Sequence, residues 1–294
     1  MNDEPNGADG RRPQERVLAV VVAFNSHDAV VRCLRSLRDQ TQPVDVLVVD
    51  NSDPNPLSID LGALGFDRAR VIWTRENLGP AGGFAFGLAW FMESGKYTHA
   101  WVMDDDNYPE PNVCDLLLRR GRELRPGIAV FPAVLNENTG ELINYPSWCG
   151  VLLDRMAVTL GGLPKAELFW WAEDTEYLQH RLPRKGVLVA RADEAVVRDD
   201  RVRRVGGRPA WKYYYEMRNM VWFRLSEQKG SELYKLPRTL VRMLGSALTS
   251  EDRGVKTRMY VKGLVHGLIG RLGRDVRPPT QEKPGYPHGG QHGD

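Results

Sequence analysis

The sequence predicts an α/β protein, in which a sheet flanked by helices is followed by a basic helical region. Apolar runs rich in β-branched residues, such as the run from Val17 to Phe24, alternate with segments of helical spacing. This alternation is typical of a sheet covered by helices. Charge separates the two regions, because residues 198–274 contain 18 lysine and arginine residues against 7 aspartate and glutamate residues, a net charge of +11. The remainder contains 22 against 31, a net charge of −9.

Strands and helices alternate through the first half of the chain. The predicted strands are residues 16–25, 44–51, 69–74, 98–104 and 127–135, and the predicted helices are residues 26–40, 82–95 and 111–124. In the first helix Val30, Leu34 and Leu37 share one face, and Ser26 or His27 stands at the capping position. Ligands of open α/β sheets bind beyond the carboxyl ends of the strands, so polar residues at those ends are candidate ligand contacts.

Three aspartates, Asp104 to Asp106, follow the predicted strand at residues 98–104. Carboxylates two residues apart can converge on one divalent cation, because hard cations prefer oxygen ligands, and a bound diphosphate would supply further ligands. The alternative is a solvated acidic turn, but the position directly after the apolar "AWVM" segment favours the metal site. An EF-hand is excluded, since Tyr108 and Pro109 occupy positions that need a ligand and a glycine.

Two further stretches lie at predicted strand ends. Asp50, with Asn51 after it, follows the second strand, where its carboxylate can accept a hydrogen bond from a nucleotide base or ribose; turn formation is an equally good interpretation. The segment "ENLGPAGGFAFG" contains glycines at 79, 82 and 83, which allow close backbone approach ahead of a helix N-terminus that favours anions. Its spacing matches neither a Walker A loop nor G-x-G-x-x-G, so alone it is weak evidence.

Acidic residues also open a predicted helix in "FWWAEDTEYLQHRL". Glu173, Asp174 and Glu176 follow three aromatic residues, and apolar surroundings raise the pKa of a carboxyl group and suit it to general-base catalysis. Ordinary capping of a helix N-terminus by acidic residues explains the same pattern, and the spacing alone slightly favours it.

The C-terminal region contains an aromatic helix over residues 211–228 and two basic amphipathic segments. The apolar stripe of residues 233–248 is formed by Leu233, Leu236, Leu240, Leu244 and Leu248, and that of residues 255–272 by Val261, Leu264, Leu268 and Leu272. Basic amphipathic helices beside tryptophans fit an anchor that lies on an anionic membrane surface; core packing with a solvated face is equally consistent. No recognition motif accompanies the positive charge, so nucleic acid binding is not expected.

Composition excludes several classes. The three cysteines, Cys33, Cys114 and Cys149, are too scattered for a disulfide framework or a zinc site, and they favour a reducing compartment. Residues 1–15 are expected to be a disordered lead-in rather than a signal peptide, and residues 274–294 a disordered tail. The longest apolar run is too short to span a bilayer, so we expect a cytoplasmic protein, peripheral on the inner face of the cell membrane through its basic helices.

Together these stretches resemble the family 2 glycosyltransferases with the GT-A fold, and more narrowly their rhamnosyltransferase and galactofuranosyltransferase branch. The resemblance covers roughly residues 16–273. It rests on the order of seven segments: "VVVAFN", "VLVVDN", "ENLGPAGGFAFG", "WVMDDD", "GLPKAELFWWAEDTEY", "YYYEMRN" and "KGLVHGLIGRLG". It implies a GT-A-type nucleotide-sugar-binding catalytic domain over residues 16–210 and a C-terminal helical region over residues 211–273.

The resemblance also implies three groups of site residues. Those that meet the nucleotide sugar are Phe24, Asn25, Asp50, Asn77, Gly79, Gly82, Gly83 and Asp105. Those that ligate a divalent cation, Mg²⁺ or Mn²⁺, through a D-x-D motif are Asp104 and Asp106. The catalytic acidic cluster consists of Asp174 as the base, with Glu173 and Glu176 as further acids. Many relatives have a histidine after the strand that follows the base helix, but residues 188–204 contain none, so Asp199, Asp200 or water would complete the metal site.

The implied function is inverting transfer of a sugar, rhamnose or galactofuranose, from a nucleotide diphosphate donor to a hydroxyl group of a lipid-linked glycan or another glycosylated acceptor. A non-catalytic nucleotide-sugar-binding subunit of a membrane-associated complex is the alternative, which the intact acidic set disfavours. A nucleotidyltransferase is disfavoured too, because "AFNSHD" stands where such enzymes carry a glycine-rich loop after the first strand.

Overall fold

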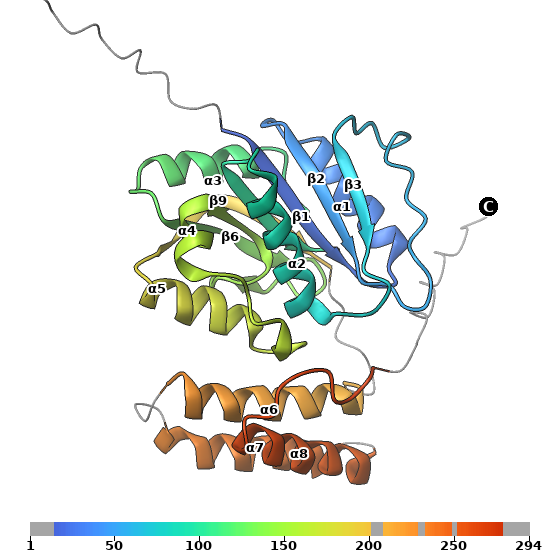
Figure 1. Ribbon diagram of the computed structural model, residues 1–294, viewed down its shortest axis with the longest axis vertical. Coiled ribbons are helices and arrows are strands. Elements are labelled where there is room, and N and C mark those ends of the chain that lie inside the picture. The colour runs from blue at the N-terminus through green and yellow to red at the C-terminus, as the bar shows by residue number, and fades with distance from the viewer. Residues whose placement is uncertain (1–14, 201–207, 229–232, 249–251, 279–294) are drawn as a thin grey trace, which may run out of the picture.

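The computed structural model describes residues 15–200, 208–228, 233–248 and 252–278 (Figure 1). Within these ranges, a nine-stranded sheet is covered by helices, and three C-terminal helices form a separate layer. The predicted α/β fold class is confirmed. Most of the two segments expected to be disordered, residues 1–15 and 274–294, lies outside the described residues.

The elements of the sheet domain follow the predicted alternation in the first half of the chain. The strands are β1 Val17–Ala23, β2 Val44–Asp50, β3 Ala69–Trp73, β4 His99–Asp104, β5 Asn107–Pro109, β6 Ile128–Asn136, β7 Leu142–Ile143, β8 Cys149–Asp154 and β9 Leu188–Asp199. The helical elements are α1 His27–Arg38, α2 Gly79–Ser94, α3 Val113–Arg122, α4 Arg155–Gly161, the 3-10 helix η1 Ala166–Leu168, the π-helix η2 Thr175–Arg181 and α5 Leu182–Arg184. The five strands and three helices expected before residue 136 are present, with their ends shifted by a few residues.

Strand β1 lies in the centre of the parallel half of the sheet, in the order β3-β2-β1-β4. Val22 pairs with Val49 of β2 and with Asp104 of β4, and the next residue of β1 pairs with Asp50. The register therefore brings Asp50 and Asp104 to the same edge of the sheet, one strand away from β1 on either side. Every residue of β1 is buried, which explains an apolar sequence without alternation.

The other half of the sheet contains strands that the sequence pattern did not reveal. Strand β8 runs antiparallel between β4 and β6, while β9 pairs in parallel with β6 and antiparallel with β5. Charged residues interrupt β9 and exposed positions mix with buried ones, and β5 is only three residues long and ends on a proline. Neither strand has the apolar run or the strict alternation by which strands are recognised.

The two faces of the sheet carry separate apolar cores. Successive β1 residues enter opposite cores, as the pleat requires: Val21 packs with α1 and α3, and Val22 packs with α2, α4 and η2. The predicted stripe of the first helix, Val30, Leu34 and Leu37, is buried in the first of these cores.

Three helices, α6 Ala210–Ser226, α7 Leu236–Leu248 and α8 Arg253–Leu268, pack together, with α6 nearest to the sheet domain (Figure 1). Helix α8 approaches α6 closely through two glycines. A Cβ atom at Gly263 would lie 2.5 Å from the carbonyl oxygen of Tyr214, and one at Gly267 would lie 2.7 Å from that of Arg218. None of the described helices combines the length and the apolar character needed to cross a membrane.

The amphipathic stripes expected for the last two helices are only partly correct. On α7, Met243 is buried, whereas Leu248 of the expected stripe is 52% exposed. On α8, Val261 and Leu268 of the expected stripe are 52% and 55% exposed. The buried residues of α8 are Lys256, Tyr260, Gly263 and Gly267. Glycine carries no hydrophobic signal, so the face that packs on α6 was hidden from the pattern.

Substitution Gly263→Ala should lower the free energy of unfolding by about 1–3 kcal/mol, because the added methyl group forces α8 away from the Tyr214 carbonyl. Gly254→Ala is the matched control, since its added Cβ meets nothing within 4 Å and alanine favours a helix by up to about 1 kcal/mol. Thermal and denaturant unfolding followed by circular dichroism compares the two. Equal stability of the two variants would contradict the close packing of α8 on α6.

Candidate active site

The three aspartates form the turn between β4 and β5, which we call the aspartate turn (residues 104–106). The backbone N–H of Asp104 donates hydrogen bonds to the carbonyl oxygen of Trp148 at 3.0 Å and to Oδ1 of Asn107 at 3.1 Å. Asp104 and Asp106 are partly exposed, whereas Asn107 is fully buried. Trp148, just before β8, and Asn107, the first residue of β5, therefore hold Asp104 at the carboxyl end of β4.

Asp105 connects the aspartate turn to the end of β1. Its Oδ2 accepts a hydrogen bond from the backbone N–H of Phe24 at 3.2 Å, and the residue is 9% exposed. Phe24 is the first residue after β1 and is partly exposed. The resemblance implied that Asp105 faces the donor sugar; in the structure, at least one of its oxygens fixes the backbone at Phe24.

Asp50 is completely buried and organises the loop that follows β2. One carboxylate oxygen accepts a hydrogen bond from the N–H of Ser52 at 2.9 Å, and the other accepts one from Leu57 at 2.7 Å. With 0% exposure, the residue presents no surface to a ligand in this conformation. These contacts match the turn-forming interpretation, and contact with a base or ribose stays a prediction.

Asn25 locks the loops after β1 and β2 together. Its backbone is left-handed, with a φ of 49°, and its N–H donates to Oγ of Ser52 at 2.9 Å. Its side chain accepts from the N–H of Asp53 at 3.2 Å and donates to the carbonyl of the same residue at 3.3 Å. The pair expected to meet a nucleotide base, Phe24 and Asn25, thus lies on a well-fixed rim at the carboxyl edge of the sheet.

The glycine-rich segment lets the start of α2 pack closely on its neighbours. Oδ1 of Asn77 accepts a hydrogen bond from the N–H of Gly79 at 2.8 Å, and Gly79 has a φ of 68°. A Cβ atom at Gly79 would overlap the carbonyl of Phe169, one at Gly82 would meet Leu78, and one at Gly83 would meet a valine of β1. The helix begins three residues earlier than predicted because the Asn77 side chain and a proline support its first turn.

Residues 168–174, here called the acidic loop, have an unusual backbone. Phe169, Trp171 and Ala172 have φ values of 61°, 79° and 64°, in the left-handed region that residues other than glycine rarely adopt. The carbonyl oxygen of Phe169 accepts a hydrogen bond at 3.3 Å from the N–H of Ala81, in the first turn of α2. The acidic loop therefore contacts the glycine-rich segment through Phe169, four residues before Glu173.

Glu173 joins the acidic loop to the aspartate turn. It is 7% exposed, and burial raises the pKa of its carboxyl group well above the usual range. The negative charges of Asp174 and then Asp104 add to that rise, and backbone N–H groups of Trp171 and Glu173 oppose it only in part. The charge of Asp104 acts on Glu173, so these two segments, far apart in the sequence, lie close enough for their charges to interact.

Asp174 caps the π-helix η2. Its Oδ1 accepts hydrogen bonds from the N–H of Thr175 at 2.6 Å and from the hydroxyl of the same residue at 3.2 Å. The capping interpretation of this acidic segment is therefore confirmed for Asp174. The residue is also partly exposed, so its carboxylate combines the capping role with the access that a general base requires.

Two other acids that we considered for the site take part in ion pairs. Glu176 is 1% exposed and accepts a hydrogen bond at 2.9 Å from Nε of Arg181. Asp200, one candidate for a further metal ligand, accepts hydrogen bonds from the Tyr108 hydroxyl at 2.9 Å and from Arg32 at 3.3 Å. These contacts explain both carboxylates without a ligand.

Three residues beside the aspartate turn or in the acidic loop carry a buried polar atom without a hydrogen-bond partner among the described residues. These atoms are Asn107 Nδ2, Trp148 Nε1 and Glu173 Oε2. Asn107 accepts from the backbone N–H of Asp104 through its side chain, whereas Trp148 accepts through its backbone carbonyl and its ring stacks on Phe84 and Tyr177. Buried polar groups are normally hydrogen-bonded, so these atoms are candidate contacts for a bound molecule.

The aspartate turn has the donor chemistry of a site for a hard divalent cation, with two carboxylates, Asp104 and Asp106, at the predicted positions. The turn is strongly negative: after burial, the charges of its three aspartates raise the pKa of the Cys33 thiol. Among the described residues, however, no group of three or more His, Cys, Asp or Glu side chains is arranged to hold a metal. Two carboxylates would hold a cation only together with oxygens from a diphosphate and water.

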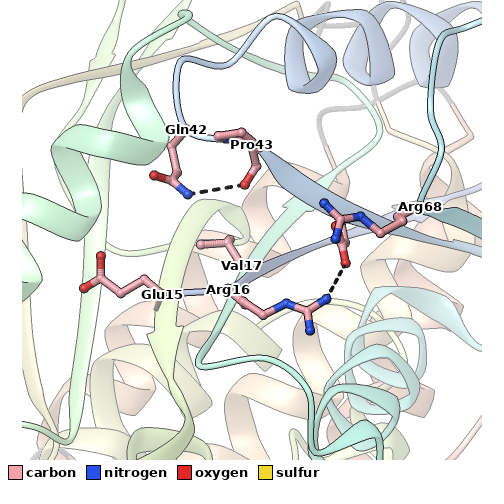
Figure 2. A pocket seen from close by; sticks show the side chains of 7 residues that line it. Glu15, Arg16, Val17, Gln42, Pro43 and Arg68 are labelled. Carbon is pink, nitrogen blue, oxygen red and sulfur yellow. Dashed lines mark hydrogen bonds and ion pairs between the residues drawn. The ribbon is translucent and has the colours of Figure 1, made fainter. Parts of the chain in front are cut away.

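A different hollow lies at the amino ends of β1 and β2, at the other edge of the sheet (Figure 2). There Asp45 lies within 3.3 Å of Arg16 and 3.2 Å of Arg68, whose side chains are 40% and 67% exposed. The remaining charged residue of the lining, Glu15, pairs with Arg122, and no predicted site residue lines this hollow. Since ligands of open α/β sheets bind at the carboxyl edge, this hollow is a poor candidate for the active site.

Sequence reasoning missed four residues that shape the candidate site: Asn107, Trp148, Arg218 and Asn219. The first two lie in or beside short strands without a clear pattern. Arg218 and Asn219 lie in the "YYYEMRN" segment of α6, are both 0% exposed, and donate hydrogen bonds to the acidic loop. An adjacent arginine and asparagine inside an aromatic helix was the one available signal, because such polar residues are rarely buried without partners.

Solved structures with similar folds are glycosyltransferases. TarS of S. aureus, residues 1–349, has a TM-score of 0.53 at 13% identity, over 87% of this chain and 92% of that protein. GalNAc-T7, solved with UDP, GalNAc and Mn²⁺, has a TM-score of 0.55 at 14% identity, over 86% of this chain and 55% of that protein. The predicted GT-A fold is therefore confirmed.

Similar sequences agree with the fold. Galactofuranosyltransferase GlfT1 of Mycolicibacterium smegmatis is 26% identical over 204 residues, which cover 59% of this chain and 67% of that protein. GlfT1 of Mycobacterium tuberculosis is 30% identical over 148 residues, which cover 50% of this chain and 48% of that protein, so this match spans about half of the relative. The family model described as "Glycosyl transferase family 2" matches residues 18–205, which include the aspartate turn and the acidic loop. The chain belongs to glycosyl transferase family 2.

Proposed function

We propose that this chain is an inverting glycosyltransferase that moves rhamnose or galactofuranose from a nucleotide diphosphate donor to a hydroxyl group of a lipid-linked glycan or another glycosylated acceptor. One observation carries the proposal: the negative charges of Asp104, at the carboxyl end of β4, and of Asp174 both act on the buried Glu173, one of whose carboxylate oxygens has no hydrogen-bond partner among the described residues. Family membership supports sugar transfer, and the similarity to GlfT1 favours galactofuranose as the sugar.

In this proposal the nucleotide binds along the rim formed by Phe24, Asn25 and the start of α2. Asn77 and the three glycines let the first turn of α2 approach the donor, and the positive end of the helix dipole favours its phosphates. Asp50, which is buried, supports the same rim by accepting hydrogen bonds from the backbone of the loop after β2.

Asp174 is the proposed catalytic base. The proton of the acceptor hydroxyl moves to its carboxylate, and the acceptor oxygen forms a bond to the anomeric carbon. The bond from that carbon to the diphosphate oxygen breaks on the opposite side, and the diphosphate leaves with the electron pair. Attack opposite to the leaving group inverts the configuration of the sugar carbon.

Glu173 is the proposed acidic neighbour of this base. Burial, then the charges of Asp174 and Asp104, raise the pKa of its carboxyl group well above the usual range, which favours the protonated form. In that form Glu173 would add no second negative charge beside Asp174 and would donate a hydrogen bond to an acceptor or sugar hydroxyl.

A divalent cation, Mg²⁺ or Mn²⁺, is the proposed cofactor, held by Asp104 and Asp106. When bound, such an ion offsets the negative charge of the diphosphate. The partial exposure of both residues and the presence of Mn²⁺ together with UDP in the GalNAc-T7 structure support this assignment. Asn107 and Trp148 fix the backbone of Asp104 and so orient its carboxylate.

The C-terminal helices are proposed to lie on an anionic membrane surface, where a lipid-linked acceptor is found. Helices α7 and α8 lie on the side of α6 away from the sheet domain (Figure 1), and they expose aliphatic side chains. Those exposed by half or more are Val241, Leu248, Val255, Val261, Leu268 and Ile269. Exposed basic residues such as Arg238, Arg242 and Arg258 accompany them. Apolar and cationic side chains on one helical layer are the combination by which helices bind membrane interfaces.

Substitution Asp174→Asn should lower turnover by about 10²–10⁴-fold and leave donor affinity nearly unchanged, because an amide cannot take the acceptor proton. Turnover is measured with a panel of nucleotide sugars, Mn²⁺ and mass spectrometry of the products. Asp115→Asn is the control, since this aspartate lies on α3 with a side chain 43% exposed. Near-normal turnover of the Asp174 variant excludes it as the base, and the absence of transfer or donor hydrolysis in wild type favours a non-catalytic nucleotide-sugar-binding subunit.

Substitution Asp104→Asn should remove most of the Mn²⁺-dependent part of donor binding, because it takes away one of two anionic ligands. We expect affinity for the nucleoside diphosphate in Mn²⁺ to fall at least tenfold, equivalent to about 1.4 kcal/mol. Titration calorimetry with Mn²⁺ and with EDTA measures the effect, again against Asp115→Asn. If wild type and the Asp104 variant bind equally well in both conditions, the cation site at this turn is wrong.

The double substitution Val241→Ser with Leu248→Ser should weaken binding to vesicles that contain phosphatidylglycerol at least about tenfold at low salt, because each change removes exposed apolar surface that enters the interface. Co-sedimentation measures binding. The matched control is Met156→Ser with Leu160→Ser on α4, whose side chains are 50% and 43% exposed on the sheet domain. Equal binding by both double variants, or no sedimentation of wild type, contradicts the membrane role without affecting the chemistry.

A further inference from the structure

We propose that Arg218 and Asn219 of α6 are positioning residues for the acidic loop, and that they hold Glu173 and Asp174 in the geometry needed for transfer. This inference rests on the proposed function, since it assigns the loop a catalytic task. The two side chains donate hydrogen bonds to backbone carbonyls of residues 167–171, and Arg218 also donates to Asn219 and to the carbonyl of Gly273. We infer that they act on the reaction through the backbone of the acidic loop.

The acidic loop needs external support because its backbone is strained. Three of its residues, Phe169, Trp171 and Ala172, adopt left-handed φ values although each carries a side chain. Residues held in such regions persist only where surrounding structure over-determines them, and they concentrate at functional sites. A loop of this kind also turns its carbonyl groups away from regular secondary structure, so those carbonyls must find other donors.

Asn219 supplies those donors at the centre of the loop. Its Nδ2 lies 2.9 Å from the carbonyl oxygen of Leu168, 2.9 Å from that of Trp170 and 2.7 Å from that of Trp171. One amide group therefore gathers three carbonyls of a four-residue stretch. The last of these carbonyls precedes Glu173 by two residues, so the contact fixes the chain immediately before the acidic pair.

Arg218 fixes the orientation of that amide. Its Nε–H donates to Oδ1 of Asn219 at 2.8 Å, which leaves the amide nitrogen facing the loop carbonyls. Its Nη2 donates to the carbonyls of Glu167 at 3.1 Å and Leu168 at 2.9 Å, and its Nη1 donates to the carbonyl of Gly273. The planar fork of a guanidinium can make all these bonds at once, and a lysine cannot.

The position of this arginine argues that its bonds have a purpose beyond packing. Arg218 is 0% exposed, and burial lowers the pKa of its guanidinium although the neighbouring Tyr214 and Tyr215 act in the opposite direction. Its Cζ lies 5.5 Å and 4.8 Å from the ring centroids of these tyrosines. Burying a cation is unfavourable unless it gains strong hydrogen bonds, and here the guanidinium donates to the neighbouring amide and to the backbone carbonyls of Glu167, Leu168 and Gly273.

The same loop also fixes the donor side of the site. The carbonyl of Phe169 bonds to the N–H of Ala81, and it occupies the space that a Cβ at Gly79 would need. A loop displaced by loss of the Asn219 bonds therefore disturbs the acidic pair first and the start of α2 less, because the Ala81 contact remains. We thus expect turnover to suffer more than donor affinity.

The test uses Asn219→Asp and Asn219→Ala in the full chain. The aspartate keeps the volume and still accepts from Arg218, but it donates nothing to the three carbonyls. The matched control is Val221→Ala, which truncates a side chain that is 0% exposed in the same helix and faces α8. Amide hydrogen exchange of residues 166–176, turnover and donor KM are measured for all four proteins at a temperature where each remains folded.

We expect both Asn219 variants to exchange the loop amides at least about tenfold faster than the control and to lose turnover by about 10²-fold, with donor KM changed less than threefold. Val221→Ala should lower the melting temperature without either effect. Unchanged exchange, or turnover within threefold of the Val221 variant, overturns the proposal. If neither Asn219 variant folds, wild-type exchange decides: loop amides protected as well as those of α6 support the proposal, and freely exchanging ones overturn it.

Failure of the proposed function can be told apart from failure of this inference. If the wild-type protein shows no transfer activity, turnover cannot be compared between variants, but hydrogen exchange still shows whether Asn219 holds the acidic loop. We also expect Arg218→Lys to lose both the exchange protection of the loop amides and turnover. Lysine keeps the positive charge but lacks the planar group that orients the Asn219 amide.

Discussion

The parallel pairing of β1 with β2 and β4 is the constraint on which the rest of the site depends. A fully buried strand has no tolerance for a shift in register, because a slip of one residue would exchange the two cores on its faces. With the register fixed, Val22 lies opposite Asp104 and the next pair contains Asp50. This register alone places Asp50 and Asp104, at the ends of their strands, at the same edge of the sheet.

The second half of the site is built differently, from irregular backbone held by buried polar side chains. Asp50 and Asn25 shape the loops after β1 and β2, and Arg218 with Asn219 shapes the acidic loop. Each of these side chains is satisfied mainly by backbone groups. Unlike a strand pair, such a loop has no repeating pattern to stabilise it, so its geometry depends on a few individual hydrogen bonds.

This difference explains what the sequence revealed. Positions such as Asp50 and Asp104 were predictable, because apolar runs mark parallel strands and ligands bind beyond their ends. The place of Asp174 followed only from a family resemblance, since nothing local indicates which loop returns to the aspartate turn. The face of α8 that packs on α6 escaped notice because Gly263 and Gly267 work by lacking side chains. Strands β8 and β9 were not predicted because partners distant in sequence determine them: β8 pairs antiparallel with β4 and β6, and β9 pairs mainly in parallel with β6.

Helix α6 belongs to the catalytic unit as much as to the C-terminal layer. The expected boundary after residue 210 would assign it to a separate helical region, yet one of its faces bonds to the acidic loop and the other packs against α8. After α8 the chain returns to the sheet domain, where Gly273 bonds to Glu167 and Arg274 lies 3.5 Å from Asp53. The C-terminal helical layer therefore contacts both the acidic loop and the rim of the proposed donor site. Because α6 makes the contacts to the acidic loop, a displacement of α6 would carry the loop with it.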